Sequence, residues 1–228
     1  MAAEVHSDPE TLATAVAARV RAAAEEAREW RGSFRMAVPG GRTPERLFQR
    51  LAEDAELPWD QVEIGFTDER AVPPESADSN YRLLMERLIR PLGPRAPRVE
   101  RMPAEWPNLR EAARASERWF AEPIDLVVLG LGEDGHIASL FPGSPLLGER
   151  GLRVSAVLDS PKPPSRRLTV TPRVLTEARA VLVMATGREK AVVIAKALAP
   201  TGSVSECPAR LVRDAEWWID RAASTALR

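Results

Sequence analysis

His136, one of only two histidines, follows a segment whose residue types suit acid–base chemistry. It ends the run Gly130-Leu131-Gly132-Glu133-Asp134-Gly135-His136, which comes directly after an apolar stretch. A histidine side chain has an ordinary pKa of about 6.5, which suits taking a proton from water near neutral pH. We expect His136 to act as a general base, with Asp134 as its positioning or electrostatic partner. For His6 we expect only a place in a fraying N-terminus.

Other chemistries fit this segment less well. Its glycines match G-x-G-x-x-G, but Glu133 and Asp134 would put two carboxylates where a dinucleotide pyrophosphate must lie. We therefore interpret the glycines as making room for His136. Two histidines and one cysteine supply no His/Cys cluster for zinc, and no G-x-S-x-G elbow is present. Direct attack by water is the chemistry that remains.

A second segment, Pro39 to Pro44, suits an anion. Gly40 and Gly41 let backbone amides approach a ligand closely, and Arg42 and Thr43 follow at the expected start of a helix, whose dipole favours negative charge. This pattern predicts a phosphate site. A tight turn followed by a threonine helix cap explains the same residues about equally well.

Further charged side chains follow other expected strands. Asp68 and Arg70 could accept sugar hydroxyls and bind anionic oxygens, or form a strand-end cap and its surface partner. Lys190 lies at an expected helix start, and Lys162 stands between prolines shortly before Arg167. These three cations could hold a phosphate, and solvated surface residues are the alternative.

Alternating strands and helices must position these segments. The pattern of apolar residues predicts strands at 34–38, 62–67, near 99, at 125–129, 168–171 and 181–185, and helices at 7–31, 43–51, 80–92, 109–120, near 174, at 188–198 and 215–223. Strands that are apolar on both faces belong to an open, mostly parallel sheet with helices on both sides. We expect a single domain over 1–228 of this doubly wound, Rossmann-like α/β class. Its ligands bind at the carboxyl ends of the strands.

Composition narrows the possible partners. The 32 basic and 33 acidic residues give a net charge of -1 without a basic arm, so we expect no nucleic acid partner. No apolar run reaches the roughly 18 residues that span a bilayer, so we expect no membrane role. The single cysteine, Cys207, rules out an internal disulfide framework and favours a cytoplasmic location. The sequence leaves the oligomeric state open.

Several motifs together resemble the 6-phosphogluconolactonase family, within the superfamily that includes glucosamine-6-phosphate deaminase. The segment 39–44 is similar to the family's Gly-Gly-x-Thr-Pro loop, 67–70 to its Asp-Glu-Arg strand end, and 130–142 to its Gly-x-Gly-x-Asp-Gly-His-x-Ala-Ser-Leu-Phe-Pro signature. The segments 160–169 and 187–191 resemble its later substrate and lysine motifs. Pro39 and Arg42 depart from the family's usual residues, so we expect Arg42 to supply charge there.

The resemblance implies hydrolysis of 6-phospho-D-glucono-1,5-lactone in the oxidative pentose phosphate pathway, without metal or organic cofactor. It implies His136 as base, Asp134 as its partner, Arg70 as a candidate anion stabiliser, and the cations named above around the phosphate. Two alternatives remain: an amino-sugar-phosphate isomerase or deaminase, and a non-catalytic sugar-phosphate-binding protein. Ser139-Leu140-Phe141-Pro142 replaces the Asn-Glu-Pro sequence usual in the deaminases, which favours the lactonase.

Overall fold

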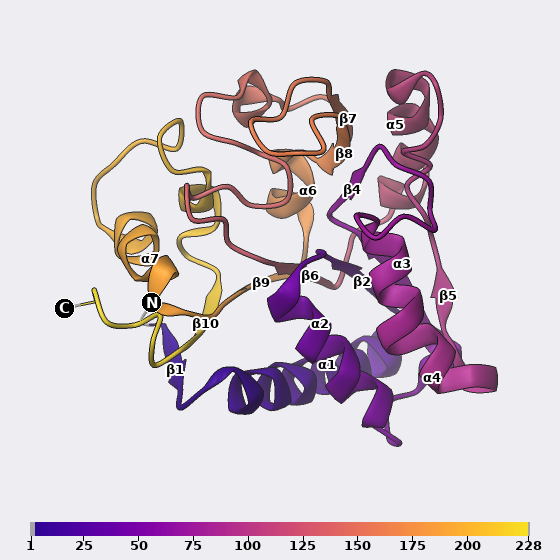
Figure 1. Cartoon of the computed structure of the whole chain (residues 1–228). Coiled ribbons are helices and arrows are strands. Elements are labelled where there is room, and N and C mark those ends of the chain that lie inside the picture. The colour runs from indigo at the N-terminus through magenta and orange to yellow at the C-terminus, as the bar shows by residue number, and fades with distance from the viewer. Residues whose placement is uncertain (1–2, 228) are drawn as a thin grey trace.

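The computed structural model describes residues 3–227 and is organised around a seven-stranded sheet whose neighbouring strands all run parallel (Figure 1). The strand order is β1-β10-β9-β6-β2-β3-β5. A small antiparallel sheet of three strands, in the order β4-β8-β7, begins where β3 ends. The expected doubly wound, mostly parallel fold is therefore confirmed, with a second sheet added to it.

The strands are β1 Glu4–His6, β2 Phe34–Val38, β3 Val62–Phe66, β4 Asp68–Arg70, β5 Arg98–Val99, β6 Leu126–Leu129, β7 Val154–Val157, β8 Arg167–Val170, β9 Ala180–Ala185 and β10 Glu216–Asp220. The α-helices are α1 Pro9–Arg31, α2 Arg42–Glu53, α3 Asn80–Leu84, α4 Arg90–Leu92, α5 Leu109–Glu117, α6 Pro172–Glu177 and α7 Ala191–Leu198. A π-helical turn, Met85–Ile89, joins α3 to α4.

The strand order explains why helices cover both faces. The chain crosses the sheet in one direction through β1, β2, β3 and β5, and in the other through β6, β9 and β10. Because crossovers between parallel strands are right-handed, α1 to α4 lie on one face and α6 and α7 on the other, while α5 packs against β7 and β8 of the small sheet. In Figure 1, α1 and α2 lie below the sheet and α6 above it. The two directions diverge between the neighbours β2 and β6, where such folds leave a crevice for ligands.

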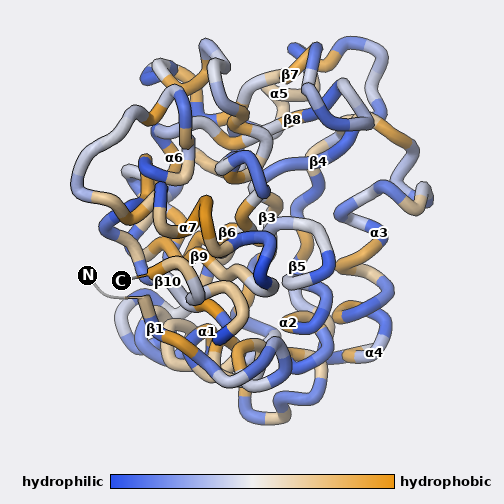
Figure 2. Tube along the Cα trace, turned by 60° about the vertical axis from the view of Figure 1, so that its left-hand side comes forward, coloured by the Kyte–Doolittle hydropathy of each residue, from blue (hydrophilic) through white to orange (hydrophobic). Residues whose placement is uncertain are grey.

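The core lies along the central strands and the helix faces against them. All of β6 is buried, and Figure 2 shows hydrophobic colour along β6 and β9. On α1, the side chains of Leu12, Val16 and Val20 are spaced by four residues and fully buried. Each such side chain contributes roughly 1.5–3 kcal/mol by leaving water. This packing fixes the strands whose carboxyl ends carry the functional loops.

The starts of α1 and α2 differ from those expected from the sequence. At α1 the cap is Asp8, whose Oδ1 accepts from the amides of Glu10 and Thr11 at 2.9 and 2.8 Å. At α2 the prediction of a Thr43 cap is wrong, because the helix begins at Arg42 and the cap position is Gly41, with φ of 108°. Only glycine adopts that backbone conformation easily, so the turn rather than a hydroxyl group sets the helix start.

The prediction of a helix over 215–223 is also wrong. Residues 216–220 form β10, which pairs with β9 on one side and with β1 on the other. Trp217 and Ile219 are buried, and the Trp218 ring stacks on His6 with centroids 5.5 Å apart. His6 therefore belongs to an ordered strand and not to a frayed end. Helical periodicity in this short segment was overridden by pairing with two distant strands.

The strand predicted at 168–171 exists, but outside the parallel sheet. It is β8, which pairs antiparallel with β4 and β7. This pairing brings Arg167 opposite Arg70 and Thr169 opposite Asp68. The small sheet thus carries side chains from two of the predicted functional segments. Among residues 3–227, no helix is long and apolar enough to cross a membrane.

Candidate active site

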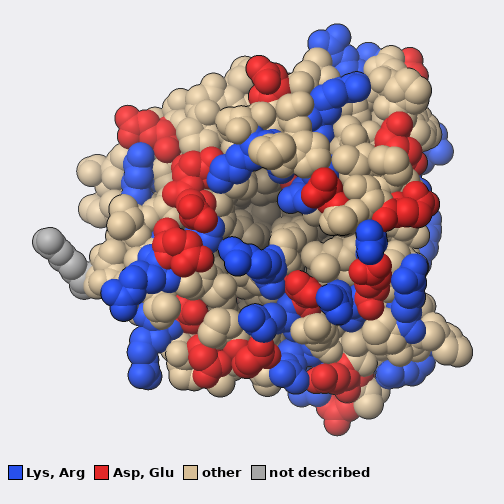
Figure 3. All heavy atoms as spheres, in the orientation of Figure 1, with Lys and Arg blue, Asp and Glu red and all other residues tan. Residues whose placement is uncertain are grey.

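A cavity of about 400 Å³ opens at the carboxyl ends of the central strands. Figure 3 shows a hollow in this face, with basic and acidic side chains around its rim. The cavity wall includes ten of the eleven predicted site residues: Gly40, Gly41, Arg42, Thr43, Asp68, Arg70, His136, Lys162, Arg167 and Lys190. The eleventh, Asp134, contacts His136 from outside the wall. The structure therefore brings the four predicted loops and the Lys162 segment to one place.

Asp134 and His136 form a close pair. Asp134 Oδ1 lies 2.5 Å from His136 Nδ1 and 3.4 Å from the His136 backbone nitrogen. Burial acts to raise the pKa of Asp134. The hydrogen bonds and electrostatic attraction of His136, together with the positive charge of Lys162, outweigh burial and hold that pKa well below its usual range. Because an ionised carboxylate only accepts, Nδ1 of the imidazole keeps its proton and Nε2 is left with the lone pair.

Glycines in the same loop make the position of the imidazole possible. A Cβ on Gly132 would lie 2.0 Å from His136 Nδ1, so any larger residue would push the ring away. Gly135 has φ of 86° and packs against the buried thiol of Cys207. On the ring's other side, the Phe141 centroid is 4.5 Å from that of His136. The geometry of Gly132 agrees with the interpretation that these glycines accommodate the histidine.

A buried network fixes Asp68 at the end of β3. Its Oδ2 accepts from Ser139 Oγ at 2.7 Å, and the Asn80 amide donates to its backbone carbonyl at 2.8 Å. The same Asn80 side chain packs on Gly40, where a Cβ would come within 1.8 Å of Asn80 Oδ1. Gly40 is therefore required for close packing as well as for access to the cavity. The network joins the loops after β2, β3 and β6.

Arg70 reaches the cavity from β4 and is held by one hydrogen bond. Its Nη1 donates to the Asp78 carbonyl at 2.9 Å, while its Nε is buried with no acceptor among the described residues. The neighbouring Glu69 carboxylate accepts from the amides of Asn80 and Tyr81 at the start of α3. Burial raises the pKa of Glu69 despite these bonds. Arg70 thus keeps donor capacity for an anion.

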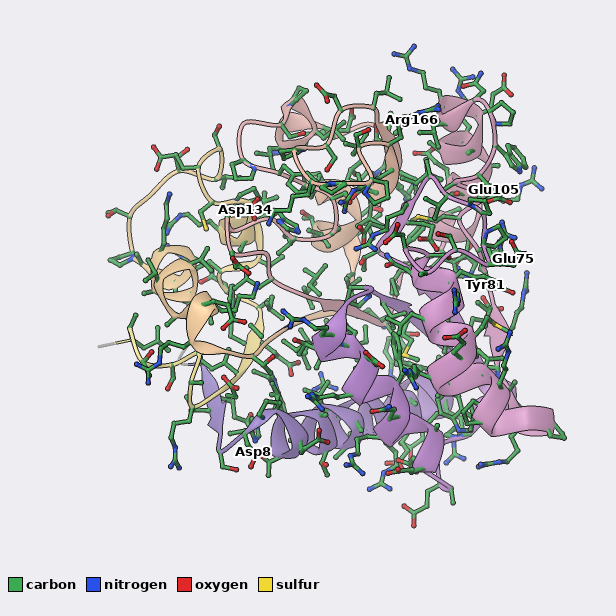
Figure 4. The ribbon with its side chains drawn as sticks, viewed as in Figure 1. Asp8, Glu75, Tyr81, Glu105, Asp134 and Arg166 are labelled. Carbon is green, nitrogen blue, oxygen red and sulfur yellow. The ribbon has the colours of Figure 1, made fainter. Side chains whose placement is uncertain are left out.

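The two lysines of the wall each face an acidic residue of the loop after β6. Lys190 Nζ lies 3.7 Å from Glu133, and Lys162 Nζ lies 3.5 Å from Asp134 (labelled in Figure 4). Lys190 ends a short 3-10 turn, Arg188–Lys190, and is the cap residue directly before α7, one residue before the first turn of that helix. In each pair one partner is largely exposed, and such ion pairs are weak, so an anionic ligand can compete for both ammonium groups.

Sequence reasoning missed several polar residues of the site. Ser139 lies within the signature segment but was given no role, and Asn80 was placed only at the start of an expected helix. That helix is capped by Ser79, whose side chain accepts from the Arg82 amide. Asp220 was hidden by the incorrect helix assignment, and it lines the cavity and accepts from the Gly187 amide. Within residues 3–227, no group of three or more His, Cys, Asp or Glu side chains is placed to hold a metal ion.

The fold and cavity define an α/β protein with a histidine–aspartate pair and several cations at the carboxyl ends of its strands. Residues 7–219 match the family model described as glucosamine-6-phosphate isomerases/6-phosphogluconolactonase. The chain belongs to this family. A 6-phosphogluconolactonase of Rattus norvegicus is 35% identical over 242 residues, covering 98% of this chain and 92% of that protein.

Solved structures support the same placement. The crystal structure of a 6-phosphogluconolactonase from Shewanella baltica OS155 has a TM-score of 0.87 at 26% identity, covering 95% of this chain and 96% of that one. A monomeric glucosamine-6-phosphate deaminase, at 19% identity, has a TM-score of 0.85 and covers 99% of this chain and 100% of that one. The second match shows that the fold is shared with deaminases, so the fold alone does not distinguish the two activities.

Proposed function

We propose that this chain hydrolyses 6-phospho-D-glucono-1,5-lactone to 6-phospho-D-gluconate by direct attack of water, as a step of the oxidative pentose phosphate pathway. The observation that carries the proposal is the Asp134–His136 pair at the wall of a cavity that also holds Arg42, Lys162 and Lys190. The relatives named 6-phosphogluconolactonase support the substrate. The chemistry needs a base and anion-binding groups, and the cavity offers both.

The first step forms the bond between water and the lactone carbonyl carbon. His136 Nε2 takes one proton from the attacking water, and Asp134 stabilises the imidazolium that results. The carbonyl oxygen becomes an oxyanion, for which Arg70 is the proposed donor because its side chain lines the cavity and only its Nη1 is hydrogen-bonded among the described residues. A positioned base contributes about 10²–10⁴-fold and oxyanion donors roughly 10²–10³-fold, which suffices for a reactive ester.

The second step breaks the bond between the carbonyl carbon and the ring oxygen. The imidazolium returns its proton to the departing ring oxygen, which becomes a hydroxyl group of the open-chain product. The base is then neutral again, and the carboxylic acid loses its remaining proton to bulk water on release. Asp68, fixed by Ser139 and Asn80, is proposed to accept a hydrogen bond from a sugar hydroxyl.

The substrate phosphate is proposed to bind at the start of α2 with Lys190. Gly41 caps this twelve-residue helix without a side-chain hydrogen bond, so the first amides of the helix are available to an anion. Arg42 adds charge, and Thr43 is held by a 2.9 Å hydrogen bond to Thr186 from the loop after β9. We also propose a cytoplasmic location, which fits the free, buried thiol of Cys207.

The test is an assay of lactone consumption with purified protein, corrected for spontaneous hydrolysis, alongside an assay of ammonia release from glucosamine 6-phosphate. We expect the first activity and not the second. His136→Asn should lower kcat about 10²–10⁴-fold with the fold retained. Binding without turnover would identify a sugar-phosphate-binding protein, ammonia release would identify a deaminase, and more than a tenth of kcat in the variant would remove His136 as the base.

A further inference from the structure

Arg167, which lines the cavity wall, directs most of its hydrogen bonds at the loop before it, and its Nη1 faces Ser139 and Asp68. Its Nη2 donates to the carbonyls of Lys162 and Pro163 at 3.0 and 3.1 Å, and its Nε donates to the Pro164 carbonyl at 2.9 Å. Nη1 lies 3.4 Å from Ser139 Oγ. The side chain is buried, with 5% of its surface exposed. Four of the five N–H donors that a guanidinium possesses therefore have partners in the protein.

The Lys162 backbone is held from a second side by Ser160. Ser160 Oγ donates to the Lys162 carbonyl at 2.9 Å and accepts from the Lys162 amide at 3.2 Å. Together with Arg167, this occupies both lone pairs of the Lys162 carbonyl. The loop is also closed by a 2.7 Å hydrogen bond from the Ser160 amide to the Ser165 carbonyl. The backbone that carries Lys162 is thus fixed at both its amide and its carbonyl.

Unlike the Arg167 side chain, the Lys162 side chain is accessible to a ligand in the cavity. Its ammonium group lies on the cavity wall, 43% of the side chain is exposed, and its neighbour is Asp134 at 3.5 Å. A lysine side chain has a flexible four-carbon chain, so its ammonium group occupies a defined position only if the backbone that carries it is fixed. The residue that fixes the backbone therefore decides where the charge stands. Arg167 suits that task because its planar fork matches several carbonyls at once.

We infer that Arg167 is a positioning residue and not a ligand of the substrate phosphate: with Ser160 it fixes the loop 160–165 so that Lys162 stands beside Asp134 at the cavity. This replaces the expectation that Arg167 contacts the phosphate directly. The inference rests on the proposed function where substrate is used to measure it, but the state of the loop can be measured without substrate.

The main test compares Arg167→Lys with Arg166→Lys. The control arginine is adjacent and exposed, and its Nη2 contacts the Pro107 carbonyl on the α5 side of the small sheet (Figure 4). Hydrogen exchange of the Ser160 and Lys162 amides, which are both hydrogen-bonded within the loop, should become at least about tenfold faster in Arg167→Lys and stay unchanged in the control. Unchanged exchange in a folded Arg167→Lys variant would overturn the inference.

A double-mutant cycle with Lys162→Ala supplies the functional readout. Arg167→Lys should raise KM for the phosphorylated lactone roughly tenfold in the wild-type background, and by less than about twofold when Lys162 is already alanine. Equal factors in both backgrounds would mean that Arg167 acts independently of Lys162, and the inference would fail. If the wild type does not turn over lactone at all, the proposed function fails while the exchange experiment still decides the role of Arg167.

If Arg167→Lys does not fold, Ser160→Ala provides a second test of whether the loop 160–165 positions Lys162. Ser160 is buried and does not line the cavity, so it can influence substrate only through the loop. We expect the same acceleration of exchange at Lys162 and the same dependence on Lys162 in KM, at smaller size. The matched control is Ser165→Ala, because Ser165 is exposed and holds the loop through its backbone carbonyl. No difference between these two serine variants would count against the inference.

Discussion

Asp134→Asn tests the proposed base most directly, because it removes one charge while keeping the size of the side chain. In the wild type the carboxylate lies 2.5 Å from His136 Nδ1, keeps the proton on that nitrogen and faces the imidazolium formed when water is deprotonated. Unit charges about 4 Å apart interact by about 4 kcal/mol at an effective dielectric constant of about 20. At 1.36 kcal/mol per decade, losing that interaction lowers the rate by about 10³.

The amide of the variant can also donate a hydrogen bond to Nδ1, which would place the imidazole proton on Nε2 and abolish its role as base. We therefore expect kcat for the lactone to fall about 10²–10⁴-fold, measured as initial rates after subtraction of spontaneous hydrolysis. The control is Glu133→Gln, which removes a charge from the same loop without touching His136; its kcat should stay within about threefold. Retention of more than a tenth of kcat in Asp134→Asn, or an equal loss in the control, would refute the reasoning.

Three further predictions concern the same cavity. Lys190→Ala should raise KM for the phosphorylated lactone roughly tenfold and leave unphosphorylated gluconolactone unaffected. Lys196→Ala, in the following helix α7 and outside the cavity wall, should change neither KM; an equal effect of Lys190→Ala on both substrates would exclude a phosphate contact. With unphosphorylated lactone, log kcat/KM should fall in acid with unit slope, because the base must be unprotonated to accept a proton from water, whereas the Asp134 carboxylate, whose pKa is held well below its usual range, stays ionised. A flat profile between about pH 5 and 8 would remove proton abstraction as the limiting step. Gly132→Ala should lower kcat at least about tenfold, because the added Cβ would lie 2.0 Å from His136 Nδ1 and displace the ring. Circular dichroism should show an intact fold, and an unchanged kcat would show that the position of the ring is not critical.

The parts of the fold that the sequence predicted are those with strong local patterns. Strand 34–38 was predicted with the bounds of β2, and the long apolar face ending at Arg31 gave α1. The loop after β6 could be identified as part of the site because few purely structural roles require glycines, a carboxylate and a histidine in one short segment. Such features are set by residues close together in the chain, so they can be read without knowing the tertiary structure.

The missed parts depend on partners far away in the chain. The segment that forms β10 has a helical pattern of its own, and it becomes a strand because β9 and β1 flank it. Asp220 was missed for the same reason, although it lines the cavity. Asn80 and Ser139 were missed because their roles depend on contacts between loops: Asn80 packs on Gly40, and Ser139 donates a hydrogen bond to Asp68. The spacing of residues in the sequence does not predict such contacts.

The pairing of β1 with β10 also has a consequence for how the protein is made. Each residue of β1 pairs with a residue that lies more than 200 positions later in the chain. During synthesis, β1 therefore has no partner until nearly all of the described chain has been made. Closing so long a loop is entropically costly and slow. While waiting, the β9 edge and the apolar side chains of α1 that pack near β10 are open to other nascent chains. Chaperone dependence of this protein should therefore be greatest before β10 has been synthesised, and a substitution that disrupts β10 should lower the yield of folded protein before it lowers turnover.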